Sequence, residues 1–272
     1  MSISRRNLLQ VTASGALLAG CSDGRPSGAA PAPAPGTSSS PSSPASPAPT
    51  GAPSSPPHAP AGEPATSAPP LPPGLPDQIE HGPRDRERLA LTFHGQGEPA
   101  LATALLAEAE KAGARVTVLA VGAWLDTYPR LARRILDGGH ELGNHTQTHG
   151  DIGAMDAAAA TAEIEGCARR LTELTGSRGR WFRPSQARMA TPLVVRLARE
   201  AGYHVLSYDV DPLDYTDPGA DRVRAAVAAR ARAGSVVSLH FGHSGTVAAL
   251  PGILDDLHRR GLRAVTTSEL LT

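Results

Sequence analysis

From residue 89 onward, short apolar runs alternate with longer segments whose apolar residues recur at helical spacing. The short runs predict buried strands and the longer segments predict helices, because side chains repeat about every 2 residues along a strand and about every 3.6 along a helix. Strands that alternate with helices pair in parallel, so the pattern predicts an α/β fold around a parallel sheet, either open or closed into a barrel. The predicted strands are 89–93, 115–121, 140–143, 181–183, 204–208, 235–240 and 263–266, and the predicted helices are 99–112, 124–136, 155–175, 192–201, 220–233 and 247–260.

Residues 1–21 have the pattern of a bacterial export signal. The pair Arg5-Arg6 is typical of a twin-arginine signal, and it is followed by a short apolar run that ends in Leu18-Ala19-Gly20-Cys21. These last residues resemble a lipobox, in which the cysteine is lipidated and becomes the new N-terminus. The run is shorter than the roughly 20 apolar residues that span a bilayer. We therefore predict a lipid anchor at Cys21 and export to the outer face of the bacterial cytoplasmic membrane.

Residues 22–76 consist almost entirely of Pro, Ala, Ser, Gly and Thr. Such a segment cannot bury enough apolar surface to offset the entropy lost on ordering, so we predict a disordered, semi-extended tether. From Asp77 the composition becomes that of a globular protein, which leaves one domain of ordinary size at 77–272.

Charge and composition exclude several classes of partner. The chain has 26 Lys and Arg against 26 Asp and Glu, and only 3% of its residues are aromatic, so we expect no nucleic-acid binding. The stretch Gly95 to Ala100 has a G-x-G-x-x-A pattern, but the next predicted strand ends in Ala120-Val121-Gly122, without the acidic residue of a dinucleotide site. We expect a monomer that contacts the membrane only through the lipid anchor.

Polar residues collect at the carboxyl ends of the predicted strands. His94, His145, Arg183, the cluster Asp209 to Asp214, and His240 each stand at or just past such an end. Ligands gather at this edge of parallel sheets and barrels. His149 follows His145 by four residues, and two imidazoles at this spacing can converge on one metal ion. The sequence therefore predicts a metal site at this edge.

These strand ends carry five short motifs, in the order Thr92-Phe93-His94-Gly95, His145-Thr146-Gln147-Thr148-His149, Phe182-Arg183-Pro184, Asp211-Pro212-Leu213-Asp214-Tyr215 and Ser238-Leu239-His240. From Leu89 to the C-terminus they resemble the polysaccharide deacetylases of the NodB-homology family, carbohydrate esterase family 4. The third motif resembles Arg-x-Pro in part, the fourth resembles Asp-x-x-Asp-Trp, and the fifth resembles Leu-x-His with its spacing shortened by one. The resemblance implies a distorted (β/α)7 barrel that holds a divalent metal, usually zinc. It also implies hydrolysis of N- or O-acetyl groups on a cell-wall or extracellular polysaccharide.

The resemblance implies a role for each motif residue. His145 and His149 would be metal ligands, and the metal would activate water by lowering its pKa. His240 would be the general acid that protonates the leaving amine, and Asp214 would fix the tautomer of His240. Arg183 would orient the neighbouring base.

The first motif departs from the family pattern Thr-Phe-Asp-Asp, in which the first aspartate is the catalytic base and the second is a metal ligand. This chain has His94 and Gly95 at these positions. His94 could be the third ligand of a three-histidine site, or it could be the base while water or another carboxylate completes the site. A third alternative is an inactive domain that binds cell-wall glycans.

Four other residues are singled out by their positions in the sequence. Cys167 lies on the apolar stripe of a predicted helix, so we expect a core thiol rather than a nucleophile. Trp181 and Tyr215 adjoin motif residues and are candidates for sugar contact. His243 is a candidate for lining the cleft.

Overall fold

The computed structural model describes residues 70–272. The twin-arginine stretch, Cys21 and nearly all of the tether at 22–76 lie outside this range, so the predictions made for them stay predictions. Within residues 70–272 no helix has both the length and the apolar character needed to span a membrane.

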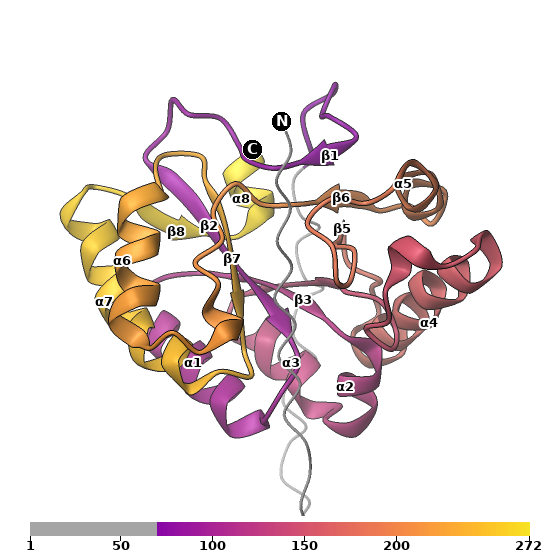
Figure 1. Ribbon diagram of the computed structural model, residues 1–272, viewed down its shortest axis with the longest axis horizontal. Helices are drawn as coiled ribbons and strands as arrows, with labels where there is room; N and C mark the ends of the chain where they lie inside the picture. Colours follow the sequence, from indigo (N-terminus) through magenta and orange to yellow (C-terminus); the bar gives the residue numbers. More distant parts are fainter. Residues whose placement is uncertain (1–69) are drawn as a thin grey trace, which may run out of the picture. The chain divides into compact units, whose positions relative to one another are not determined.

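Parallel strands form the centre of the fold, as the alternation of strands and helices predicts (Figure 1). The order of the strands in the sheet is β1-β6-β5-β4-β3-β2-β7, and β8 pairs with β2. Every ladder in this sheet is parallel. The strands are β1 (Gln78–Ile79), β2 (Arg88–Gly95), β3 (Thr117–Ala120), β4 (Glu141–Asn144), β5 (Trp181–Phe182), β6 (His204–Leu206), β7 (Val236–His240) and β8 (Arg263–Val265).

The sheet curves into a distorted barrel. Beyond β6 the chain reaches β7, where Val210 and Val237 form an isolated parallel bridge and the amide of Ser238 donates to the carbonyl of Val210 at 2.9 Å. This joint is one bridge rather than a continuous ladder. The parallel strands and their helices confirm the predicted α/β fold, and this single bridge links β7 to the segment that follows β6.

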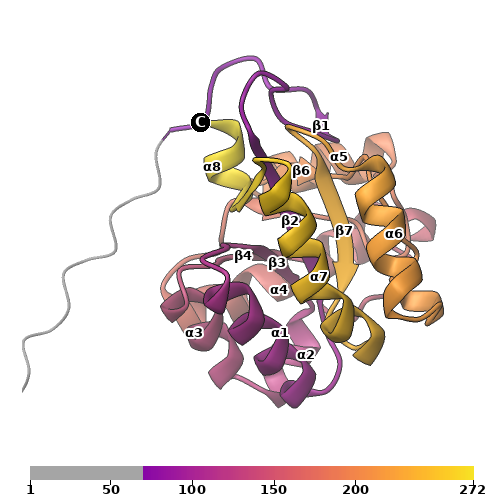
Figure 2. The ribbon, with the colours of Figure 1, turned by 90° about the vertical axis from the view of Figure 1, so that its left-hand side faces the viewer.

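Helices surround the strands (Figures 1 and 2). Apolar side chains of the sheet pack against them, and Phe93, Val118 and Leu239 are fully buried in this layer. The helices are α1 (Pro99–Lys111), α2 (Gly122–Thr127), α3 (Arg130–Asp137), α4 (Ala157–Thr175), α5 (Pro192–Glu200), α6 (Ala220–Arg230), α7 (Ser244–Arg259) and α8 (Thr267–Leu271), with short 3-10 turns η1 (Ile152–Ala154) and η2 (Asp214–Thr216).

The single helix predicted at 124–136 is wrong, because the chain forms α2 and α3 there. Tyr128 lies between them with φ −126° and ψ 61°, and Pro129 caps the start of α3. Proline disfavours helical geometry in the residue before it and cannot donate an intrahelical hydrogen bond. The break turns the chain before β4, whose end carries the histidine pair.

Cys167 is fully buried on α4, as expected. Its thiol donates to the carbonyl of Ala120 at 3.3 Å, and burial raises the pKa of the thiol to about 12. A thiol with this pKa is almost entirely protonated at neutral pH, so Cys167 is a packing residue and not a nucleophile.

The register of neighbouring strands places the motif residues side by side. On β2 and β7, His94 pairs with His240 and Thr92 pairs with Ser238. On β4 and β5, Asn144 pairs with Phe182, so the residues that follow these strands are also neighbours. Alternate residues of a strand share a face, so His94, Ser238 and His240 all point to the inner side of the barrel.

Candidate metal centre and active site

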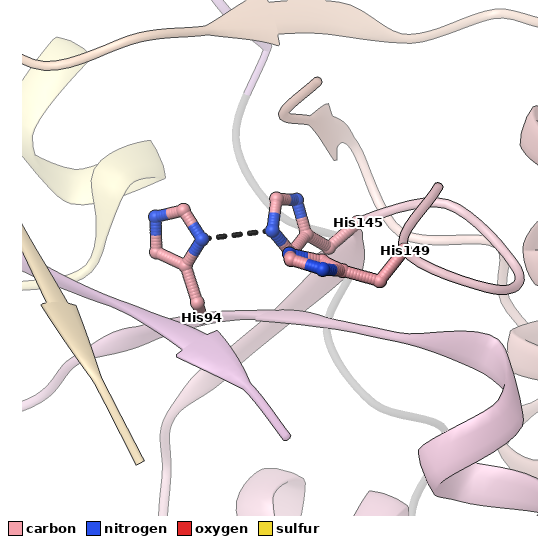
Figure 3. Close-up of side chains that lie close together, drawn as sticks. All are labelled: His94, His145 and His149. Carbon is pink, nitrogen blue, oxygen red and sulfur yellow. Dashed lines mark hydrogen bonds between the residues drawn. The ribbon is translucent and has the colours of Figure 1, made fainter. Parts of the chain in front are cut away.

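Three histidines converge at the carboxyl end of the barrel (Figure 3). His94 ends β2, and His145 and His149 follow β4. Nδ1 of His94 lies 2.8 Å from Nε2 of His145, and one nitrogen from each of the three side chains lies within 4.8 Å of the others. His94 and His145 are buried, whereas His149 is half-buried. The structure thus brings together all three residues predicted as ligands.

The loop after β4 reaches this geometry through residues with positive φ. Thr146 has φ 69° and His149 has φ 63°. The side chain of Asn144 holds the turn, because its Oδ1 accepts from the amide of Thr146 at 2.8 Å. The hydroxyl of Thr146 accepts in turn from the amide of His149 at 3.2 Å. Such backbone conformations cost roughly 1–3 kcal/mol each and persist where the surroundings enforce them.

The hydrogen bonds of His145 define which of its nitrogens is free. Its Nδ1 donates to the carbonyl of Arg183 at 3.0 Å, so Nδ1 carries the hydrogen and Nε2 has the lone pair. That lone pair points to His94. A carbonyl that orients a ligating histidine in this way is common at metal sites.

Burial favours the neutral form of the three imidazoles. Burial, followed by the charge of a neighbouring histidine, holds the pKa of His94 and of His145 well below the usual range. The pKa of His149 is lowered by the same two causes, with burial again the larger. Neutral imidazole is the form that binds metal, so the donor set fits a divalent transition ion.

Position 95 could not supply a carboxylate ligand to the histidine cluster. A Cβ atom built at this position would lie 2.8 Å from Cγ1 of Val118 and 3.0 Å from Cα of Ala120. Both neighbours belong to the layer between the sheet and the helices. A side chain at position 95 would therefore point away from the histidines. Within residues 70–272, His94 is the side chain from the end of β2 that reaches the cluster.

His240 and Asp214 form a second element of the site. Nδ1 of His240 donates to Oδ1 of Asp214 at 2.7 Å, and Asp214 is 1% exposed. Oδ2 of Asp214 accepts from the amide of His240 at 2.8 Å and from the hydroxyl of Thr246 at 2.7 Å. The ring of His240 stacks on that of His94, with centroids 4.2 Å apart. This arrangement leaves Nε2 of His240 as the nitrogen available for proton transfer.

Arg183 is completely buried beneath the cluster. Its Nε donates to the carbonyl of Leu206 at 3.1 Å and its Nη2 donates to the carbonyl of Ser207 at 3.0 Å. The remaining nitrogen, Nη1, lies 3.4 Å from Nε2 of His94. Burial lowers the pKa of Arg183 to about 10, so the guanidinium remains charged at neutral pH. The side chain contacts His94, and the predicted role of Arg183 in orienting a base stays a prediction.

A cleft of about 480 Å³ opens over these residues, lined by His94, His149, His240, Tyr215 and His243 among others. Tyr215 is 47% exposed and its ring packs edge-on against His240, with centroids 5.1 Å apart. His243 lines the cleft as expected. Trp181 is fully buried, so the expectation that it contacts sugar is wrong.

Two features of the cleft were not predicted from the sequence. The hydroxyl of Ser238 lies 3.0 Å from Nε2 of His94, although nothing in the motif suggested a role for this serine. At the rim of the cleft, Nδ1 of His243 lies 2.8 Å from Oδ1 of Asp217, and the two residues form a second histidine–aspartate pair. Asp217 follows the motif residue Asp214 by three positions, but an aspartate near a motif is only a weak sign of function, because loops are rich in aspartate.

Known deacetylases are similar to this chain in sequence. The family model for polysaccharide deacetylases matches residues 81–206. A peptidoglycan-N-acetylglucosamine deacetylase of Bacillus cereus is 32% identical over 197 residues, which are 70% of this chain and 90% of that protein. A chitooligosaccharide deacetylase of Bradyrhizobium sp. is 29% identical over 159 residues, which are 53% of this chain and 73% of that protein.

Among solved structures, a family 4 carbohydrate esterase pseudoenzyme from Bacillus anthracis matches with a TM-score of 0.69 and 24% identity. The match covers 72% of this chain and 69% of that one, and it shows that the two share a fold. The family match at 81–206 includes the three histidines and Arg183, and it stops before Asp214 and His240.

Proposed function

The chain belongs to the polysaccharide deacetylase family, and from this membership we propose that it is a metal-dependent hydrolase that removes N- or O-acetyl groups from a cell-wall or extracellular polysaccharide. In the N-acetyl case the bond that breaks is a carbon–nitrogen bond outside a peptide. The observation that carries the proposal is the position of the histidine cluster, which shares one open cleft with His240, whose Nδ1 is held by the buried carboxylate of Asp214.

We assign the metal to His94, His145 and His149. Three imidazoles with an open side suit a catalytic zinc ion, and we propose zinc as the metal. When bound, such an ion polarises the acyl carbonyl and lowers the pKa of water. His94 is the third ligand rather than the base in this assignment, because its Nδ1 points to Nε2 of His145 at 2.8 Å.

His240 carries the proton transfers. Its Nδ1–H is held by Asp214, so Nε2 is free to take the proton from the attacking water and to return it to the leaving nitrogen. The carboxylate of Asp214 supports the imidazolium that exists between these two steps. This role includes the general acid that the sequence predicts for His240. It also replaces the aspartate base that the chain lacks.

Exposed apolar side chains beside the cleft support a glycan substrate. Among residues 70–272 the large hydrophobic residues that are exposed are Met189, Leu213 and Tyr215, at 41%, 47% and 47%. They belong to two loops whose other residues line the cleft. Aromatic and apolar surfaces of this kind pack against the faces of sugar rings. The relatives of Bacillus cereus and Bradyrhizobium sp. are a peptidoglycan-N-acetylglucosamine deacetylase and a chitooligosaccharide deacetylase, and we propose an acetylated amino sugar of the cell wall as the substrate.

The N-terminal segment supports a location outside the cytoplasm. We infer that Cys21 is lipidated and that residues 22–76 tether the domain at 77–272 to the outer face of the cytoplasmic membrane. A proline-rich tether of this kind holds a domain away from its anchor and within reach of the cell wall.

Acetate release tests the proposal. The purified protein is stripped with a chelator and reloaded with zinc, and acetate is then measured with peptidoglycan, chitooligosaccharides and an O-acetylated glycan. We expect release from at least one substrate by the zinc-loaded protein, and none by the stripped protein or by the double variant His145→Ala with His149→Ala. A folded, zinc-loaded protein that binds these glycans and releases no acetate would instead be a glycan-binding module.

A further inference from the structure

The two ring nitrogens of His94 have different neighbours. Nδ1 faces Nε2 of His145 at 2.8 Å, on the side where the three histidines meet. Nε2 faces the hydroxyl of Ser238 at 3.0 Å and Nη1 of Arg183 at 3.4 Å. Ser238 is 1% exposed, so bulk water does not compete for this position.

Metal binding through Nδ1 places a requirement on these neighbours. A neutral imidazole has one hydrogen, so a lone pair on Nδ1 requires the hydrogen on Nε2, where it needs an acceptor. The guanidinium of Arg183 has only donors and cannot accept it. The hydroxyl of Ser238 can both donate and accept, and it is the nearer of the two groups.

We propose that Ser238 is a positioning residue that supports the metal-binding tautomer of His94 by accepting the hydrogen of Nε2, which Arg183 cannot accept. This inference rests on the proposed function, because it concerns the same histidine cluster. Ser238 contacts neither the metal nor the substrate in this role. It acts through His94.

The hydrogen bonds around His94 show which hydrogen would move on metal binding. Nε2 of His145 is an acceptor, because Nδ1 of His145 donates to the carbonyl of Arg183. In this arrangement His94 donates from Nδ1 to His145, and its Nε2 then accepts from the hydroxyl of Ser238. When Nδ1 binds metal the hydrogen moves to Nε2 and the same hydroxyl becomes the acceptor. A hydroxyl serves both states by rotating about its C–O bond.

The strand register explains how the chain holds the pair together. Ser238 pairs with Thr92 across β7 and β2, one pleat before the pair of His94 and His240. The register therefore keeps the hydroxyl of Ser238 beside Nε2 of His94.

Zinc affinity of Ser238 variants tests the proposal without substrate. Competition with a chromogenic chelator measures affinity for the wild type, Ser238→Ala and Ser238→Thr. Removing a hydrogen-bond partner of a ligating histidine weakens metal binding by about 10–100-fold, and we expect this loss for Ser238→Ala. Ser238→Thr retains the hydroxyl and should retain affinity to within a few-fold. Thermal unfolding of the metal-free variants identifies any loss that comes from misfolding.

His94→Asp provides the matched background. Oδ1 of aspartate lies as many bonds from Cα as Nδ1 of histidine, so it reaches the same place, and a carboxylate has no tautomer to select. In this background Ser238→Ala should leave zinc affinity unchanged. An equal loss in both backgrounds, or no loss in the wild-type background, overturns the proposal.

Nitrogen-15 NMR of the zinc-loaded wild type gives a direct reading. We expect the hydrogen of His94 on Nε2 with zinc and on Nδ1 without it, and a hydrogen on Nδ1 in both states overturns the proposal. Acetate release is measured separately on the same samples. A protein with the expected affinities that releases no acetate contradicts the proposed function and leaves the role of Ser238 supported.

Discussion

The pair of His240 and Asp214 leads to a sharp prediction for Asp214→Asn. The carboxylate accepts three hydrogen bonds, from Nδ1 of His240 at 2.7 Å, from the amide of His240 at 2.8 Å and from the hydroxyl of Thr246 at 2.7 Å. An asparagine has nearly the same shape, but only one of its two terminal atoms accepts. If its oxygen keeps the amide and hydroxyl donors, its NH2 group faces Nδ1 of His240.

That substitution reverses the tautomer of His240. Nδ1 must then accept, so the hydrogen moves to Nε2, which can no longer take a proton from water. Replacing the buried aspartate of a serine-protease histidine–aspartate pair by asparagine lowers kcat by about 10⁴-fold for the same reason. We expect a loss of about 10²–10⁴-fold here, equivalent to roughly 3–5 kcal/mol of barrier. The free energy of unfolding should fall by only about 1–3 kcal/mol, the usual cost of an unsatisfied buried group.

The assay measures acetate release beside zinc content. Asp214 does not belong to the histidine cluster, so zinc should stay bound. Asp217→Asn is the matched control, because Asp217 holds Nδ1 of His243 at 2.8 Å in the same way but its side chain is 68% exposed. We expect that variant to keep activity to within about tenfold. Zinc-loaded Asp214→Asn with nearly full activity, or an equal loss in both variants, would refute the role given to Asp214.

Three further predictions concern the remaining parts of the site. Burial depresses the pKa of His94 and His145 in the folded protein. Below about pH 6.5 the unfolded chain therefore binds more protons than the folded chain. As the pH is lowered, the free energy of unfolding should decrease by up to about 1.4 kcal/mol per pH unit for each histidine. Urea unfolding at pH 7.5 and 5.5 measures this, and an equal fall in a variant with asparagine at both positions contradicts it. Gly95→Asp should lower the free energy of unfolding by at least about 1–3 kcal/mol, because its Cβ would lie 2.8 Å from Cγ1 of Val118. The same variant should not tighten zinc binding. Tighter binding in chelator competition would show that the side chain at position 95 faces the histidine cluster. Tyr215→Ala should raise KM for the glycan several-fold while zinc affinity stays the same, and an unchanged KM would place the sugar elsewhere.

Much of the architecture could be predicted because it depends on local patterns. The alternation of apolar runs and helical segments indicates parallel strands, and parallel strands bring their carboxyl ends to one edge. His94, His145 and His240 were therefore expected to meet, although they are far apart in the sequence. The break between α2 and α3 was missed even though Pro129 signals it, because the apolar spacing on either side of the proline suits one helix.

Other features depend on geometry that no local pattern encodes. Trp181 stands in a strand of two residues, and which face it takes depends on the register with β4 and β6. The positive φ of His149 depends on the hydrogen bonds of the preceding turn. The contact of Ser238 with His94 requires the register of β2 and β7, because the two residues lie 144 positions apart in the sequence.

The metal content of the purified protein tests the central claim most directly. Wild type and His94→Ala are each equilibrated with zinc, passed through gel filtration and analysed by mass spectrometry for metal per chain. The three-histidine site predicts one tightly bound zinc ion in the wild type and a large loss in His94→Ala. A wild-type protein that holds no zinc, or a His94→Ala variant that holds it as tightly as the wild type, would contradict the account.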